Sequence, residues 1–206
     1  MPNKVDEGTL SDLNNSILAT SDYMEKLGTA LWLQILYVVK ILVPYSLQHD
    51  YSFSTIEIVS VISVKGLAGL TLVLCLAYSA WRFRKSDPLI SIGIAWYFGS
   101  LLIVSNLIFP IGATFAERFV FTPSLGILIV LLGVVKKYQL DAHPPKGYTY
   151  AFLALVGVFT VVSIDRNKDW KDNYTLYSAD YPKLENSARG NYNYGTVSQE
   201  RAAITN

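Results

Sequence analysis

The sequence has little charge and only one cysteine. Of its 206 residues, 16% are charged and 51% are hydrophobic, whereas a soluble domain usually carries about 25% charged residues. The single Cys75 excludes a disulfide within the chain and a metal site built on several thiolates. The formal net charge of +1 gives no electrostatic reason to expect nucleic acid as a partner. Together these features exclude disorder and most soluble folds.

Familiar catalytic motifs are also missing. The sequence holds no Gly-rich phosphate loop, no HExxH, no GxSxG and no cluster of metal ligands. We therefore expect no cofactor and no divalent metal. Residues 1–26 are polar and of mixed charge, without the basic and apolar regions of a cleaved signal peptide. We expect membrane insertion to rely on internal segments.

Long apolar runs fill the middle of the chain and predict an all-α membrane protein. A helix crosses about 30 Å of hydrocarbon with about 20 residues, and five windows approach that length: 27–47, 58–81, 88–109, 119–135 and 148–164. These runs are continuous rather than alternating, which favours helices over barrel strands. The predicted domains are a polar segment over 1–26, a transmembrane domain over 27–164 and a polar tail over 165–206.

Basic residues in the short loops predict the orientation of these spans. Arg118 is the one Lys or Arg residue in the loops after the first and third windows. The loops after the second and fourth windows contain six such residues: Arg82, Arg84, Lys85, Lys136, Lys137 and Lys146. Lys and Arg accumulate in cytoplasmic loops. This asymmetry places the basic loops and residues 1–26 in the cytoplasm, and the C-terminal tail outside.

Two predicted outer loops contain residues that suit binding chemistry. His49 and Asp50 lie between aromatic residues after Pro44, where the alternative is a simple interfacial turn. Glu117 and Arg118 lie at the mouth of a span, in a Pro- and Gly-containing segment whose backbone needs partners other than lipid. On spacing alone, an anion site and a simple ion pair remain equally open for Glu117 and Arg118.

Lys40 and Lys65 lie inside predicted spans, each in the outer half. An ammonium near the centre of a membrane helix costs about 2.5–3.5 kcal/mol on insertion scales. Snorkelling to the membrane surface lowers that cost and is one interpretation. The other is that both side chains face an anionic ligand at the outer leaflet.

Four ordered segments carry a resemblance to a known family. They are Pro44 with His49-Asp50-Tyr51-Ser52, then Phe109-Pro110 with Glu117-Arg118 and Pro123-Ser124, then Arg166-Asn167 with Asp169-Trp170, and finally Asn186-Ser187-Ala188-Arg189. From about residue 14 to its end, the chain resembles the C-terminal membrane half of transmembrane and tetratricopeptide-repeat proteins, most closely the bacterial ones. Asn186 or Ser187 can cap a first repeat helix. Only about 20 residues follow, against about 34 in one repeat, so we expect a fragment whose last segment is at most partly helical.

The resemblance implies membership of the glycosyltransferase C superfamily and a place in a bacterial inner membrane. Such enzymes transfer a mannose-like sugar from a polyprenyl-phosphate carrier to a protein or other acceptor on the outer face. The superfamily's catalytic acid lies in a loop with no counterpart in this chain, so the catalytic residue is unknown. The expected carrier-binding residues are Arg118, oriented by Glu117, with Lys40, Lys65, His49 and Asp50. The alternative is a non-catalytic membrane anchor that presents repeats to partner proteins.

Overall fold

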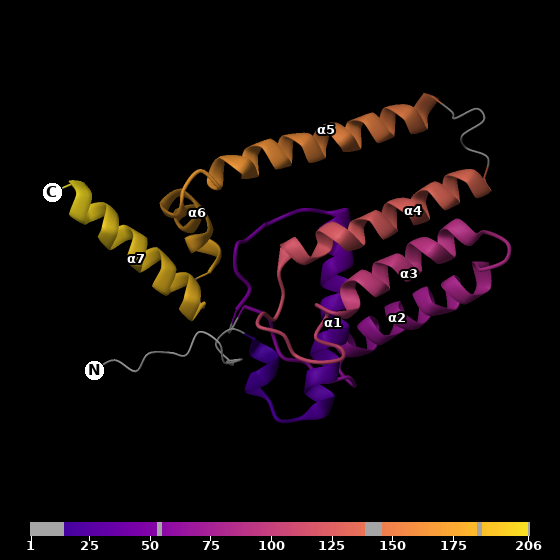
Figure 1. The fold of residues 1–206 in the computed structure, drawn as a ribbon, viewed down its shortest axis with the longest axis horizontal. Coiled ribbons are helices and arrows are strands. Elements are labelled where there is room, and N and C mark those ends of the chain that lie inside the picture. The colour runs from indigo at the N-terminus through magenta and orange to yellow at the C-terminus, as the bar shows by residue number, and fades with distance from the viewer. Residues whose placement is uncertain (1–14, 53–54, 139–145, 185–186, 206) are drawn as a thin grey trace.

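The computed structural model describes residues 15–52, 55–138, 146–184 and 187–205, and within these ranges the chain is helical without a strand (Figure 1). The α-helices are α1 (Tyr23–Leu42), α2 (Val64–Phe83), α3 (Pro88–Leu102), α4 (Phe121–Lys137), α5 (Lys146–Asp169), α6 (Asn173–Asp180) and α7 (Ala188–Thr205). Short 3-10 turns lie at Ser16–Ala19, Glu117–Val120 and Tyr181–Lys183. The predicted all-α class is confirmed for this part of the chain.

Capping residues and prolines set helix ends that hydropathy windows miss. The Ser63 hydroxyl accepts a hydrogen bond from the Gly66 amide at 3.1 Å, so α2 begins at Val64 rather than at residue 58. Pro88 begins α3, where its missing amide is not needed, and this start agrees with the predicted window 88–109. The same helix ends at Leu102 rather than at residue 109, and Asn106 beyond it has a positive φ of 57°. Apolar residues before α2 and after α3 therefore form loops.

Helices α2, α3 and α4 run side by side, and α3 and α4 meet at two glycines. A Cβ atom on Gly93 would lie 2.6 Å from the carbonyl oxygen of Gly126, and a Cβ on Gly126 would lie 2.6 Å from that of Gly93. Such contact distances are open only to glycine, because any side chain would collide with backbone. This close approach builds the bundle that supports the loops at its ends.

Two described segments are long and apolar enough to cross a membrane, namely α2 and the continuous stretch Glu117–Lys137. Helix α3 is apolar but shorter. Helix α5 contains the fifth predicted window and exposes a run of apolar side chains: Phe152, Leu153, Leu155, Val156, Val158, Val161 and Ile164. A membrane protein agrees with these features, while the number of five spans stays a prediction.

Helix α1 runs across α2, α3 and α4 instead of alongside them (Figure 1). It contacts the start of α2, where a Cβ on Gly69 would lie 2.3 Å from the carbonyl oxygen of Leu31. Its buried side includes Thr29, Ala30, Leu33 and Tyr37, and its remaining surface carries three charged residues. The first window therefore forms a helix that runs across the bundle and not parallel to its other helices.

The N-terminal segment lies beside a loop that the sequence places on the opposite side of the membrane. The Asn15 side-chain amide donates to Asn106 Oδ1 and to the Ile111 carbonyl, both at 2.8 Å. The Ser16 amide donates to Thr114 Oγ1 at 2.7 Å. Two directly bonded segments cannot lie on opposite sides of a bilayer, so the predicted opposition does not hold for residues 15–20. Helix α1 runs across α2, α3 and α4, and its last turn also meets this end of the bundle, where Lys40 Nζ lies 3.5 Å from Glu117 Oε1. Residues 1–14 lie outside the described part of the chain.

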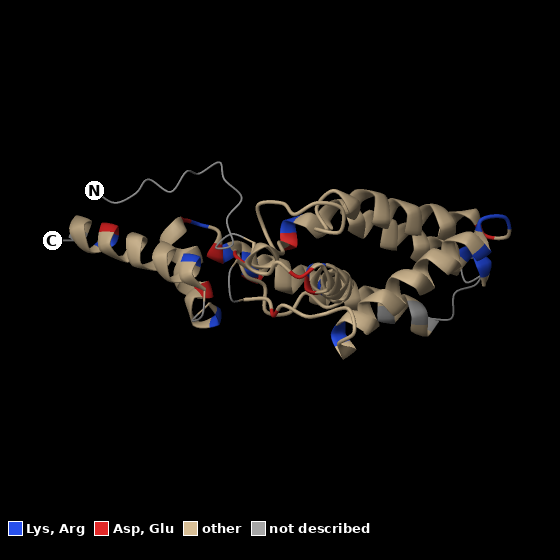
Figure 2. Ribbon diagram, turned by 90° about the horizontal axis from the view of Figure 1, so that it is seen from below, with Lys and Arg blue, Asp and Glu red and all other residues tan. Residues whose placement is uncertain are grey.

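Basic side chains at the ends of α2 and α4 lie at the other end of the bundle (Figure 2). This arrangement leads to a labelling prediction in a Cys75→Ser background. New cysteines at Ser21 and Ala202, both exposed, should react with an impermeant thiol reagent in intact cells, and one at Ser86 should not. Labelling of position 86 alone, or opposite results at positions 21 and 202, would overturn the orientation.

Candidate functional site

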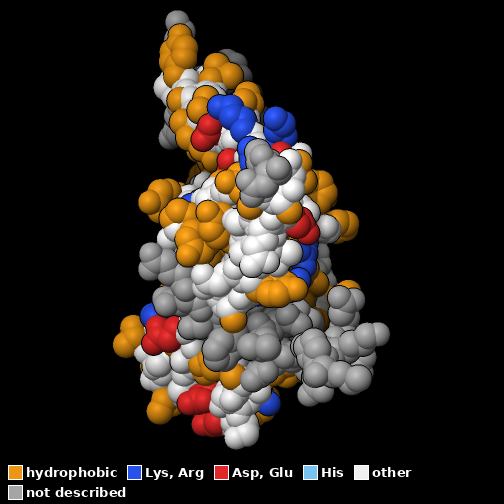
Figure 3. All heavy atoms as spheres, turned by 90° about the vertical axis from the view of Figure 1, so that its left-hand side faces the viewer, with side chains coloured by type: hydrophobic (Ala, Val, Ile, Leu, Met, Phe, Trp, Pro, Cys, Tyr) orange, Lys and Arg blue, Asp and Glu red, His pale blue; other side chains and the backbone are white. Residues whose placement is uncertain are grey.

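The four segments that carry the sequence resemblance meet in one place. A pocket of about 300 Å³ lies between the loops around residues 49–52 and 112–118 on one side and α6 and α7 on the other. Its lining residues are His49, Asp50, Tyr51, Ser52, Gly112, Ala113, Phe115, Ala116, Arg118, Trp170, Asn173, Leu176, Tyr177, Arg189 and Asn193. At this end of the molecule, charged side chains of both signs lie among hydrophobic ones (Figure 3).

Asp180 joins the C-terminal tail to the first loop through a buried network. Its fully buried carboxylate accepts hydrogen bonds from the His49 backbone amide at 2.7 Å and from His49 Nδ1 at 2.9 Å. The Arg166 guanidinium binds both carboxylate oxygens, at 2.7 and 2.8 Å. Burial raises the pKa of Asp180, but the hydrogen bonds from His49 and Arg166 outweigh it and hold that pKa well below its usual range. The network fixes α6 against the loop.

Asp50 makes the second connection between the loop and the tail. Its carboxylate accepts hydrogen bonds from the Ser52 hydroxyl at 2.5 Å and the Ser187 hydroxyl at 3.2 Å. The Ser187 oxygen accepts in turn from the Gly190 amide at 3.0 Å and so caps α7. Ser187 is thus the cap, and the alternative, Asn186, lies outside the described residues. Through this chain of bonds Asp50 positions the start of α7.

Glu117 and Lys40 bind the first loop, which lines the pocket. Glu117 Oε1 accepts hydrogen bonds from the Gln48 amide at 3.0 Å and from the Tyr51 hydroxyl, and it lies 3.5 Å from Lys40 Nζ. Lys40 also donates to the carbonyls of Tyr45 at 2.7 Å and Ser46 at 3.0 Å. Glu117 therefore holds the first loop. The prediction that it orients Arg118 is wrong. Consecutive residues on a helical turn point in different directions.

Arg118 is exposed at the pocket and makes no ion pair within the described residues. Its guanidinium lies 5.2 Å from the centre of the Phe119 ring, a weak contact that leaves its hydrogen-bond donors available. Lys65 lies elsewhere, paired with Glu57 and 5.7 Å from the Trp32 ring centre. Of the six predicted binding residues, three line the pocket: His49, Asp50 and Arg118.

Sequence reasoning missed the pairing of Asp180 and Arg166. Arg166 stands in one of the resembling segments, but nothing in the pattern around Asp180 marks it as buried, because its partners are 14 and 131 residues away in the chain. The Nε2 atom of His49 is buried and has no hydrogen-bond partner among the described residues. In the same part of the chain, no group of three or more His, Cys, Asp or Glu side chains could hold a metal ion.

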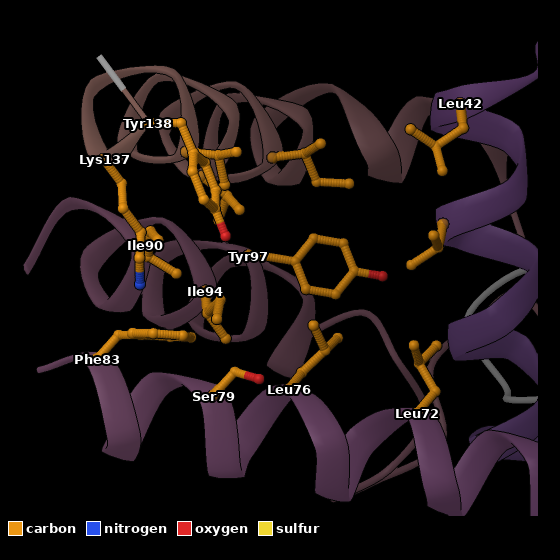
Figure 4. A pocket seen from close by; sticks show the side chains of 14 residues that line it. Leu42, Leu72, Leu76, Ser79, Phe83, Ile90, Ile94, Tyr97, Lys137 and Tyr138 are labelled. Atoms are coloured by element: carbon orange, nitrogen blue, oxygen red, sulfur yellow. The ribbon is translucent and has the colours of Figure 1, made fainter. Parts of the chain in front are cut away.

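A second pocket, of about 360 Å³, lies between α1, α2, α3 and α4 (Figure 4). It is lined mainly by aliphatic and aromatic side chains, and Lys137 at its edge is paired with Asp87 at 3.0 Å. Tyr97 extends across it toward α1, with its hydroxyl 3.5 Å from the Gln34 carbonyl. This lining suits hydrocarbon and supplies no group for bond-making chemistry. The pocket of about 300 Å³, which is lined by His49, Asp50 and Arg118, is therefore the candidate functional site.

Comparison with known proteins finds distant relatives of one kind. The chain is 26% identical over 171 residues to Protein O-mannosyl-transferase F38B6.6 of Caenorhabditis elegans, covering 82% of this chain and 24% of that protein. It is 24% identical over 151 residues to Protein O-mannosyl-transferase TMTC3 of Homo sapiens, covering 71% and 16%. With Protein O-mannosyl-transferase Tmtc2 of Drosophila melanogaster the identity is 32% over 101 residues, covering 48% and 11%. No family model and no solved structure matches the chain.

These relatives confirm the resemblance at the level of the transmembrane and tetratricopeptide-repeat protein O-mannosyl-transferases. They are all animal proteins, and the closer likeness to bacterial members stays a prediction. The chain spans about a quarter or less of the length of these relatives. What the whole proteins do is therefore a proposal for this chain.

Proposed function

We propose that this chain is the C-terminal membrane portion of a glycosyltransferase. The enzyme transfers a mannose-like sugar from a polyprenyl-phosphate carrier to a protein acceptor on the outer face of the membrane, which for a bacterial protein is the inner membrane. Two findings support this: the relatives are named as protein O-mannosyl-transferases, and four separated sequence segments surround one pocket. The convergence of those segments carries the proposal, because chance similarity would not place them together.

In this proposal, Arg118 binds the phosphate of the carrier. It lies at the pocket, at the start of the apolar stretch Glu117–Lys137, and no carboxylate of the described residues neutralises it. A guanidinium binds two phosphate oxygens with parallel hydrogen bonds, which an ammonium cannot reproduce. The start of a membrane helix is also where the headgroup of a lipid-linked donor would lie. Lys40 and Glu117 act by holding the loop that shapes the pocket.

Replacing Arg118 should weaken carrier binding by the full-length protein. A hydrogen bond to a charged group contributes about 1.5–3 kcal/mol, so a net loss equal to one such bond in Arg118→Ala should lower affinity for a polyprenyl-phosphate sugar roughly 10- to 150-fold. Arg118→Lys keeps the charge and should recover only part of that loss. Binding is measured in detergent or nanodiscs, with Arg84→Ala at the opposite end of the bundle as the matched control. Unchanged affinity in a folded Arg118→Ala variant would remove Arg118 from the site.

A non-catalytic anchor is the second candidate, favoured by the tail. Helices α6 and α7 pack against each other as a helical pair that buries Leu176, Leu184 and Val197, which is how a repeat scaffold for partner proteins would begin. The sequence predicts a tail that is at most partly helical, and the continuous helix Ala188–Thr205 corrects this. Helix α7 packs against α6, which covers the apolar side chains that the sequence-based prediction leaves without a neighbour. An anchor would show no affinity for the sugar carrier.

A further inference from the structure

The pocket holds neutral polar side chains that phosphate binding does not require. Asn173 and Asn193 both line it, and neither side-chain amide makes a hydrogen bond within the described residues. Each amide offers two donors and an acceptor with two lone pairs. A phosphate accepts hydrogen bonds only, and it would leave the acceptors of both amides unused. The pocket is therefore equipped for a ligand whose groups both donate and accept.

Helix geometry aims these side chains at the same space. Asn173 and Tyr177 are four residues apart on α6, and Arg189 and Asn193 are four residues apart on α7, so each pair lies on one helix face. The Asp180 network and the Asp50–Ser187 contact hold both helices against the loop that carries His49 and Asp50. Glu117, the residue before Arg118, binds the same loop through the Gln48 amide. The polar groups are consequently placed on a rigid support opposite the cation.

Trp170 adds an aromatic surface at the pocket. Its side chain is 61% exposed although it is a large hydrophobic residue, and it lies just before α6. An exposed indole beside amides that make no hydrogen bond within the described residues suits a ligand with one apolar face and several hydroxyl groups. A pocket of about 300 Å³ is at the lower end of the size range for ligand sites. These properties describe a single sugar ring.

We propose that this pocket binds the sugar ring of the lipid-linked donor, with Trp170 covering one face of the ring and Asn173 and Asn193 bonding its hydroxyls. The inference rests on the proposed function and extends it, since Arg118 would hold the phosphate that is joined to the same sugar. The sugar and phosphate subsites would then be adjacent in one pocket, the first built mainly by α6 and α7 and the second by the loop before α4.

The test compares two carriers, polyprenyl phosphate with and without mannose, binding to the full-length protein. Trp170→Ala should weaken binding of the mannose-bearing carrier about three- to tenfold, and Asn193→Ala about fivefold. Both variants should leave binding of the sugar-free carrier unchanged, whereas Arg118→Ala should weaken both carriers. Tyr192→Ala is the matched control, because Tyr192 is a 73% exposed aromatic on α7 that does not line the pocket.

The outcomes separate this inference from the proposed function. Equal weakening for both carriers, or no change for either, in the Trp170 and Asn193 variants overturns the sugar subsite while carrier binding by the parent protein stands. A change confined to the affinity for an acceptor peptide assigns the pocket to the acceptor and also overturns the inference. If the parent protein binds neither carrier, the proposed function fails and the sugar subsite fails with it.

Discussion

Asp180→Ala should release α6 and α7 from the membrane loops. Removing one partner of a buried ion pair costs about 3–5 kcal/mol, because the remaining charge stays buried without a counter-charge. Here the substitution would remove the two shortest bonds of Arg166, leave it only the partly exposed Asp169 as a counter-charge, and remove both bonds of His49 to the carboxylate. Amide hydrogen exchange in α6 and α7 should accelerate by more than about a hundredfold if exchange proceeds through this opening.

Asp169→Ala is the matched control for that experiment. Asp169 binds the same guanidinium at 2.9 Å, but its side chain is 31% exposed, so its loss should cost about 0–1 kcal/mol. The pKa of Asp180 is lowered in the fold, so its stabilising contribution is present at neutral pH and is lost only as the pH falls well below the ordinary range for Asp. Equal exchange rates in the parent protein and Asp180→Ala would show that this network does not hold the tail.

Gly93→Leu should separate α3 from α4. The first atom of the new side chain would lie 2.6 Å from the Gly126 carbonyl oxygen and 2.7 Å from the Val130 amide nitrogen. Both are backbone atoms of a helix, so the collision is relieved only by moving the whole helix. Overpacking of a well-packed contact costs about 1–3 kcal/mol and sometimes more, and a clash with backbone belongs at the upper end.

Gly99→Leu provides the comparison on the same helix. A Cβ at Gly99 meets nothing within 4 Å, so the same substitution changes helix propensity and side-chain size without a collision. Thermal unfolding in detergent should show a clearly lower midpoint for Gly93→Leu than for the parent protein, and little or no loss for Gly99→Leu. Similar midpoints for the two variants would contradict the close contact between α3 and α4.

The sequence predicts the helical class and the start of α3 at Pro88, because long apolar runs and prolines act locally. It does not predict the course of α1. Hydropathy over 27–47 counts apolar residues, whereas the direction of that helix depends on the contact of its buried side with Gly69 of α2. Predicting residues 15–20 on the wrong side of the outer loops follows from that single error. The hydropathy of a sequence window predicts neither the direction of α1 nor the position of residues 15–20.

The candidate site also contains some residues that the sequence predicts and others that only the tertiary structure reveals. His49, Asp50 and Arg118 are predictable because they stand in the short segments that carry the resemblance, and Arg118 is the single basic residue of the predicted short outer loops. The role of Glu117 is not, since its partners Gln48, Tyr51 and Lys40 come from a distant segment rather than from the neighbouring Arg118. Asp180 depends wholly on tertiary contacts. Lys65 shows the opposite error, a charge inside an apolar window that pairs locally with Glu57.

The most direct test of the account is sugar transfer itself. Membranes that contain the full-length protein are supplied with polyprenyl-phosphate mannose carrying a labelled sugar and with a Ser- and Thr-containing acceptor peptide, and labelled peptide is measured over time. The account predicts transfer by the parent protein, a roughly 10- to 150-fold lower rate for Arg118→Ala at low donor concentration, and an unchanged rate for Arg84→Ala. No transfer by the parent protein, or equal rates for the parent and Arg118→Ala, would contradict it.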